Sequence, residues 1–174
     1  VEMLPAQKKQ YLEMEKKARV AIEEQEEIVG YVNQTTMLAT YAWLKQFANG
    51  LCDLEEKGYK ENMSTGIMEM KYKAKPLDTA SPKLDAIWAI IQELDIDSES
   101  GEKILLFSQF KGWIDLVYTW LGDKGIPVGK ITGDVKTTDR NTVIEDFQNP
   151  DGQIRVMCMT TQAAGTSINL DMAD

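Results

Sequence analysis

The 174-residue sequence contains no histidine and only two cysteines. Without histidine, the chain cannot use an imidazole as a general acid, a general base or a metal ligand. Cys52 and Cys158 lack the paired spacing of zinc ligands, and two cysteines are too few for a disulfide framework. We therefore expect no metal site and no structural disulfides in this chain.

Long hydrophobic runs are also missing. No apolar run approaches the roughly 20 residues that cross a membrane, and no segment resembles a signal peptide. We therefore expect an intracellular protein, cytoplasmic or associated with the nucleoid or nucleus, without a membrane partner. The first residue is Val1, and the last residues, NLDMAD, do not resemble a natural end. We expect a fragment of a longer chain.

An excess of basic residues is absent too, because the formal net charge is −9. Residues 1–95 contain 12 basic and 16 acidic side chains, and residues 96–174 contain 7 and 12, so neither part is basic. This balance argues against a protein that holds nucleic acid by bulk electrostatic attraction. Any contact with nucleic acid must be local, through backbone amides, hydroxyl groups and a few lysines.

The N-terminal part has helical periodicity. Pro5 suits a first helical turn, and apolar residues then recur at helical spacing as far as Ile22. A second helical stretch contains Met37 and Leu44 and has Gly50 as its stop signal. Residues 53–80 are polar and irregular, which predicts a linker or a protrusion.

Within that polar region, the segment MEMKYKAK alternates apolar and charged residues from Met68 to Lys75. This alternation predicts a half-buried strand. Lysines commonly protect an edge strand against aggregation, and we favour that explanation over a basic strip that faces DNA.

From Ser81 onward, helical and strand patterns alternate. Ser81 and Pro82 predict a helix start, with the serine as cap and the proline in the first turn. Three short apolar runs predict strands: KILLF, VGKIT and IRVMCM. KILLF is typical of a strand that is buried on both faces.

Two amphipathic stretches separate these strands. The first contains Trp113 and Trp120, and the second contains Phe147 and begins at Thr137 or Thr138. Residues 103–159 therefore have a β-α-β-α-β pattern, with connections long enough for right-handed crossovers. The pattern predicts an α/β fold with a parallel sheet and helices on both of its faces.

Polar residues follow each predicted strand. Ser108 and Gln109 follow the first strand, Gly133 follows the second, and Thr160 and Thr161 follow the third. Since open α/β sheets bind ligands at the carboxyl ends of their parallel strands, these residues indicate a binding edge. After the third strand, small residues allow close backbone approach to a ligand, and hydroxyl groups offer donors.

Several segments resemble, in order and spacing, the second RecA-like lobe of Swi/Snf-type ATPases, which belong to the superfamily 2 helicases and translocases. They are LPAQKKQYLEMEKKA, which resembles a helix upstream of the lobe, SPKLDAIWAIIQEL, which resembles the lead-in to the lobe, and KILLFSQFKGWIDLVYTWL, KITGDVKTTDRNTVIEDFQ and RVMCMTTQAAGTSINLDMAD, which resemble the lobe itself. The third resembles motif IV, and the last resembles motif V. The fourth resembles the family's Asp-Gly…Arg element, with Thr132 in place of the aspartate, followed by Gly133 and Arg140.

The resemblance implies a domain organisation and a function. Residues 81–174 would form the second RecA-like lobe, a partial three-layer α/β/α fold that is incomplete at its C-terminus. Residues 1–80 would form a helical segment and a linker or protrusion. The full-length protein would be an ATP-dependent DNA helicase or translocase, in which ATP closes the cleft between two lobes. ATP and Mg²⁺ would be held mainly by the first lobe, and we expect no cofactor in this chain.

The resemblance also suggests contacts to DNA. A grip that ignores base sequence needs hydroxyls and amides on phosphate rather than side chains that read bases. Thr161 is the first candidate, with Thr160 beside it, and Ser108, Gln109 and Lys111 follow. From the sequence alone, Thr160 and Thr161 are equally consistent with capping of a short helix after the strand. The resemblance favours phosphate contact.

Further positions are assigned by the resemblance alone. Gly165, Ser167 and Asn169 lie in the part of motif V that borders the nucleotide. Gly133 and Arg140 belong to a structural motif, and we expect Arg140 to pair with a neighbouring acid rather than with DNA.

The sequence departs from the family pattern in three respects. Two of the usual glycines of motif V are Ala164 and Ser167, which puts close nucleotide approach there in doubt. The phosphate-binding pattern GxxxxGK[ST] is absent, and so is the arginine-rich motif VI. We therefore expect no catalytic residue here and no ATPase activity of this chain alone. Cys158 is expected to be a core residue.

Two alternatives stay open. The chain can be a non-catalytic interaction module that docks a protein partner through its N-terminal helices. It can also be the lobe of an RNA-directed superfamily 2 helicase, although FSQF and SINL favour the branch that translocates on DNA.

Overall fold

A computed structural model of the chain describes residues 2–29, 34–61, 63, 66, 68–77, 81–96 and 102–164. The chain divides into two compact units, Val1–Lys83 and Leu84–Asp174.

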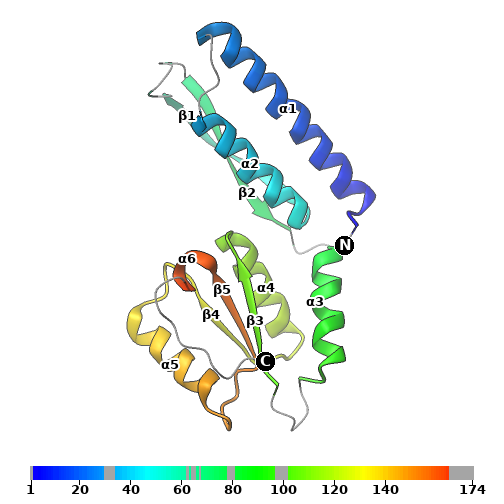
Figure 1. Cartoon of the computed structure of the whole chain (residues 1–174), viewed down its shortest axis with the longest axis vertical. Helices are drawn as coiled ribbons and strands as arrows, with labels where there is room; N and C mark the ends of the chain where they lie inside the picture. The colour runs from blue at the N-terminus through cyan, green and yellow to red at the C-terminus, as the bar shows by residue number, and fades with distance from the viewer. Residues whose placement is uncertain are drawn as a thin grey trace. The chain divides into compact units, whose positions relative to one another are not determined.

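The first unit consists of two helices and a hairpin of two strands. They are α1 (Pro5–Val29), α2 (Gln34–Asn49), β1 (Cys52–Glu61) and β2 (Met68–Pro76). The two predicted helices are confirmed, and α1 and α2 lie side by side along the hairpin (Figure 1). Their shared core contains Met14, Phe47, Cys52 and Ala74.

Two glutamines of α1 connect this helix to α2 and β1 by hydrogen bonds. Gln7 is almost fully buried, and its side-chain nitrogen donates to the backbone carbonyl oxygens of Phe47 (3.0 Å) and Ala48 (3.2 Å) at the end of α2. The amide of Gln10 donates to the Cys52 carbonyl and accepts from the Cys52 N–H. The Gln10 side chain therefore makes the two hydrogen bonds with the Cys52 backbone that a residue of a neighbouring strand would make.

The expectation of irregular structure over residues 53–80 is wrong for the described part of that region. The alternating segment is strand β2, as predicted, but the acidic segment before it is a second strand, β1, paired antiparallel with β2. Lys73 and Lys75 lie opposite Glu55 and Asp53 in this register. Because side chains directly opposite in a sheet share a face, acids accompany these lysines, and the hairpin does not present a purely basic strip.

The second unit is the predicted parallel sheet. Its strands are β3 (Ile104–Ser108), β4 (Val128–Ile131) and β5 (Val156–Thr160), in the spatial order β3-β5-β4. Both pairings are parallel, so the α/β prediction is confirmed. The helices are α3 (Pro82–Glu93), which begins at the boundary of the units, α4 (Lys111–Asp123), α5 (Thr137–Gln148) and the short α6 (Thr161–Ala164).

Alternate residues of the central strand β5 face two different helix layers. Val156 and Cys158 belong to a core with residues of α3 and α4, and Met157 and Met159 belong to a core with α5. Figure 1 shows α4 and α5 on opposite sides of the sheet. This arrangement is the predicted covering of both faces by helices.

The expectation that the KILLF strand is buried on both faces is wrong. Within the described sheet, β3 is an edge strand, and the Phe107 side chain is 52% exposed. The strand whose residues are all buried is β5, because it is the central strand and its two faces pack against the two helix layers. An apolar run indicates burial but does not give a strand's position in the sheet.

Candidate nucleic-acid interface

The carboxyl ends of the three parallel strands lie at one edge of the sheet. Ser108, the last residue of β3, is the register partner of Thr160, the last residue of β5. Ile131 ends β4 beside Met159, one residue before Thr160, so Gly133 follows at the same edge. We call this region the carboxyl edge. It therefore brings together the polar residues that follow all three strands (Figure 1).

The two threonines after β5 differ in exposure. Thr160 is buried in the sheet, whereas Thr161, the first residue of α6, is exposed. Within the described part of the chain, the Thr161 hydroxyl has no hydrogen-bond partner. An exposed hydroxyl at the end of a buried strand can donate to an anion in solution.

Ser108 shapes the turn into α4. Its Oγ accepts a hydrogen bond from the Phe110 N–H (3.1 Å), and its own O–H stays available as a donor. Helix α4 starts after Phe110 without a side-chain cap and without an acid in its first turn. A helix start with uncapped N–H groups attracts anions, because the helix dipole adds positive potential there. Gln109 is exposed beside it.

Lys111 points its ammonium at two carboxylates. Its Nζ lies 2.6 Å from Asp115 Oδ2 on α4 and 2.9 Å from Asp134 Oδ2 after β4. The hydrogen bonds from Lys111 to Asp115 and Asp134 raise the pKa of the Lys111 ammonium to about 12. Lys111 therefore lies at the carboxyl edge, as predicted from the sequence, but its ammonium is already paired with two carboxylates.

The ion pairs continue into the sheet. Lys130 of β4 donates to the other oxygen of Asp115 at 2.6 Å, and its Nζ lies 4.8 Å from the centre of the Tyr118 ring. Burial of Asp115 raises its pKa, but hydrogen bonds from both lysines outweigh burial, and the pKa lies below its usual value. The sequence reasoning missed this network, although the Lys111–Asp115 spacing of four residues in a helix was its signal.

Arg140 has a structural position. Its guanidinium donates to the backbone carbonyl oxygens of Val135 (2.9 Å) and Thr132 (2.8 Å), which lie in the loop after β4. The expected partner, a neighbouring acid, is replaced by backbone carbonyls. Arg140 thereby holds the loop that contains Gly133 at the carboxyl edge. The predicted nucleotide-proximal residues Gly165, Ser167 and Asn169 lie outside the described residues.

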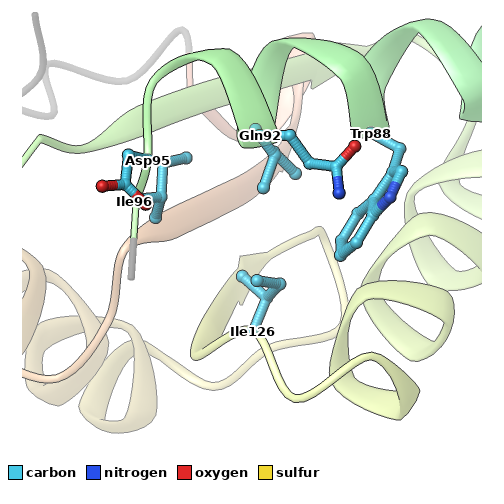
Figure 2. A pocket seen from close by; sticks show the side chains of 6 residues that line it. Trp88, Gln92, Asp95, Ile96 and Ile126 are labelled. Carbon is cyan, nitrogen blue, oxygen red and sulfur yellow. The ribbon is translucent and has the colours of Figure 1, made fainter. Parts of the chain in front are cut away.

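A pocket lies elsewhere in this unit. It has a volume of about 230 Å³ and is lined by the end of α3 and the loop before β4. Figure 2 shows Trp88 and Gln92 extending from α3 toward the loop that contains Ile126. Lys124 of that loop lies 4.3 Å from the Trp88 ring centre. The loop precedes β4, so the pocket is not part of the carboxyl edge.

Metal and membrane features are absent from the described residues. Within the ranges that the structure covers, no cluster of three or more potential ligands is placed to hold a metal ion. Among the helices described, none is long and apolar enough to cross a bilayer. Cys158 is buried in the sheet, as predicted, and burial raises the pKa of its thiol to about 12.

Comparisons with known proteins point to one family. The family described as helicase conserved C-terminal domain matches residues 83–174. The ATP-dependent DNA helicase DDM1 of Arabidopsis thaliana is 33% identical over 75 residues, which make up 43% of this chain and 10% of that protein. The match thus spans only about a tenth of this relative's length.

Solved structures show the same fold. The C-terminal domain of the Sulfolobus solfataricus SWI2/SNF2 ATPase has a TM-score of 0.67 at 21% identity, covering 98% of this chain and 65% of that one. The core of this ATPase in complex with dsDNA has a TM-score of 0.64 at 21% identity, covering 98% of this chain and 31% of that one.

Proposed function

This chain belongs to the helicase conserved C-terminal domain family, and we propose that it is the DNA-gripping second motor lobe of a Swi/Snf-like, ATP-dependent DNA helicase or translocase. The observation that supports a DNA grip most is the meeting of three polar loops at the carboxyl edge. Its residues offer hydroxyl and amide donors rather than a broad basic surface, and such donors suit phosphate contacts that ignore base sequence.

Thr161 is the central contact in this proposal. Its exposed hydroxyl donates to a phosphate oxygen of the tracked strand, and the hydroxyl of Ser108 and the amide of Gln109 contact the same backbone. Thr160 is largely covered, so it supports the position of Thr161 and contributes less to binding. The uncapped start of α4 adds N–H groups and positive potential next to Ser108.

Duplex DNA is the proposed substrate. The similar Sulfolobus core is a complex with dsDNA, and DDM1 is named a DNA helicase. Arg140 keeps the loop after β4 in place by bonding its carbonyl oxygens, which leaves the Gly133 region ordered beside the DNA. A substrate of this kind requires that the protein acts in a compartment that contains DNA.

ATP and Mg²⁺ belong mainly to the first RecA-like lobe of the same protein, and that lobe is the proposed partner of this one. Closure of the two lobes on ATP and their reopening after hydrolysis move the grip along one strand. Gly165, Ser167 and Asn169 border the nucleotide in this proposal. The sequence has no GxxxxGK[ST] loop to bind a triphosphate. The 174-residue chain therefore has no ATPase activity of its own, which a phosphate-release assay with duplex DNA checks.

The experiment that tests the grip measures binding of the chain to a fluorescently labelled DNA duplex by anisotropy at low salt. Thr161→Val keeps the shape of the side chain and removes the hydroxyl. Losing a hydrogen bond to a charged group costs about 1.5 kcal/mol or more, so Kd should rise about tenfold.

Thr119→Val is the matched control, because Thr119 is an exposed threonine whose hydroxyl bonds only within α4, to the Asp115 carbonyl. It should leave Kd unchanged. Equal affinities of the wild type and Thr161→Val would contradict the proposed role of Thr161. A single-stranded RNA that displaces the duplex at equal concentration would favour the RNA-directed alternative.

A further inference from the structure

The charges around Lys111 cancel within the chain. Lys111 and Lys130 contribute two positive charges, and Asp115 and Asp134 contribute two negative charges, all connected by ion pairs of 2.6–2.9 Å. Lys111 is a cation at the carboxyl edge, yet a phosphate that approaches it meets a cluster without net charge. The proposed grip therefore gains little from Lys111 as long as both of its partners stay in place.

The two partners of Lys111 differ in how firmly they are held. Asp115 is four residues away on the same helix, and its second oxygen is bound by Lys130. Asp134 lies on the separate loop after β4, its side chain is 64% exposed, and Lys111 is its ion-pair partner. Of the two carboxylates, Asp134 is the one that a competing anion can replace at small cost, because an exposed ion pair is weak.

We propose that Asp134 is an internal competitor for DNA phosphate at Lys111, and that it sets the affinity and the salt dependence of the carboxyl edge. The inference rests on the proposed DNA grip. When the DNA backbone binds beside Thr161, one of its phosphate oxygens takes the position of the Asp134 carboxylate next to the Lys111 ammonium. The displaced carboxylate then loses its ion pair with Lys111, and this loss weakens the complex.

Such a competitor suits a motor lobe. A lobe that moves along DNA must release each phosphate after every cycle, and an aspartate ready to rebind Lys111 favours release. A basic edge without this aspartate would bind more tightly and would leave DNA more slowly, because affinity differences between variants of one interface lie mostly in the dissociation rate. Asp134 thus lowers the affinity for DNA and raises the rate at which the contact is released.

The test compares Asp134→Asn with the wild-type chain in the duplex anisotropy assay over a series of salt concentrations. The substitution keeps the shape and removes one negative charge. Because an exposed ion pair contributes little, the expected gain in affinity at low salt is about two- to fivefold. Without the Asp134 charge, the cluster of Lys111, Lys130 and Asp115 should carry one net positive charge, so the slope of log K against log[salt] should steepen by up to about 0.9.

Two controls separate a local effect from a change in net charge. Asp151→Asn removes the same charge at an exposed position of the loop before β5, away from the carboxyl edge, and should change Kd much less. In a Lys111→Gln background, Asp134→Asn should lose its extra effect and match Asp151→Asn. Thermal melting of each variant establishes that its fold is intact.

The possible failures are distinguishable. If the wild-type chain binds DNA and Asp134→Asn binds no tighter than Asp151→Asn, the inference about Asp134 is wrong while the grip stands. If Asp134→Asn still tightens binding in the Lys111→Gln background, the competition does not act through Lys111. If neither the wild type nor Asp134→Asn binds the duplex, the proposed grip fails and the inference fails with it.

Discussion

Replacing Gly152 with alanine should strongly destabilise the unit 84–174. A Cβ atom at this position would lie 1.8 Å from the carbonyl oxygen of Asp146 and 2.9 Å from that of Asn149. Both obstacles are backbone atoms, so no side chain can rotate away. The loop would have to leave the end of α5, and with it the Asp146 carboxylate would lose the N–H groups of Gln153 and Ile154.

The size of the effect follows from these contacts. Forcing an extra methyl group into packed surroundings costs about 1–3 kcal/mol, and two lost bonds to a carboxylate add to it, so we expect about 3 kcal/mol or more for Gly152→Ala. A Cβ atom at Gly129 would meet only side-chain atoms, the nearest of them Val143 Cγ1 at 2.8 Å, and no backbone atom. We expect about 1–2 kcal/mol for Gly129→Ala. A Cβ atom added at Gly133 would meet no atom within 4 Å, and Gly133 has no positive φ. Gly133→Ala should therefore leave the stability unchanged or raise it slightly.

Urea unfolding followed by tryptophan fluorescence measures the relative stabilities of the three glycine variants. Three of the four tryptophans lie in the unit 84–174, namely Trp88, Trp113 and Trp120, so the signal reports mainly on that unit. A loss of 3 kcal/mol should lower the urea midpoint by about 1–3 M. A Gly152→Ala variant with the wild-type midpoint, or a Gly133→Ala variant less stable than Gly152→Ala, would refute the reasoning.

Three further outcomes are expected. Lys103→Met should lower the free energy of unfolding by about 1.5–3 kcal/mol, because the buried ammonium of Lys103 donates to two carbonyl oxygens at the end of α5; urea unfolding measures it. Cys52 and Cys158 should not react with a thiol reagent at pH 8 until urea is added, since burial raises their thiol pKa values to about 11 and about 12; rapid labelling of the native chain would contradict this. The pKa of Asp115 is lowered in the folded chain, so its stabilising contribution is present above pH of about 4 and is lost as pH falls through the folded pKa. An Asp115→Asn variant should therefore have a shallower acid branch in a plot of stability against pH.

Local patterns in the sequence predicted most of the fold of residues 81–164. Helix α4 and strand β5 were predictable because hydrophobic periodicity identifies elements whose burial comes from their own neighbours. The order of the motifs placed the polar residues after each strand, and the parallel register places Ser108 beside Thr160. The prediction of a helicase C-terminal lobe over residues 81–174 is confirmed by the family match over residues 83–174.

The missed features depend on contacts between distant segments. Strand β1 has an acidic sequence without alternation, and it forms because β2 pairs with it. Strand β3 lies at the edge because the spatial order of the strands is β3-β5-β4, and an apolar run does not encode this order. The pairing of Lys111 with Asp134 joins the first residue of α4 to the loop after β4, 23 positions along the chain, and no spacing rule relates them. Burial of Lys103, a residue type that is rarely inside, was equally unpredictable.

The most direct test of the proposed grip maps where DNA touches the chain. Backbone amide chemical shifts are recorded by NMR while a DNA duplex is added at low salt. The proposal predicts that the largest shifts occur at Ser108, Gly112, Gly133 and Thr161, and that the amides of Ile104 and Arg155, at the other end of the strands, stay unchanged. Shifts that gather at Ile104 and Arg155, with none at Thr161, would contradict a grip at the carboxyl edge.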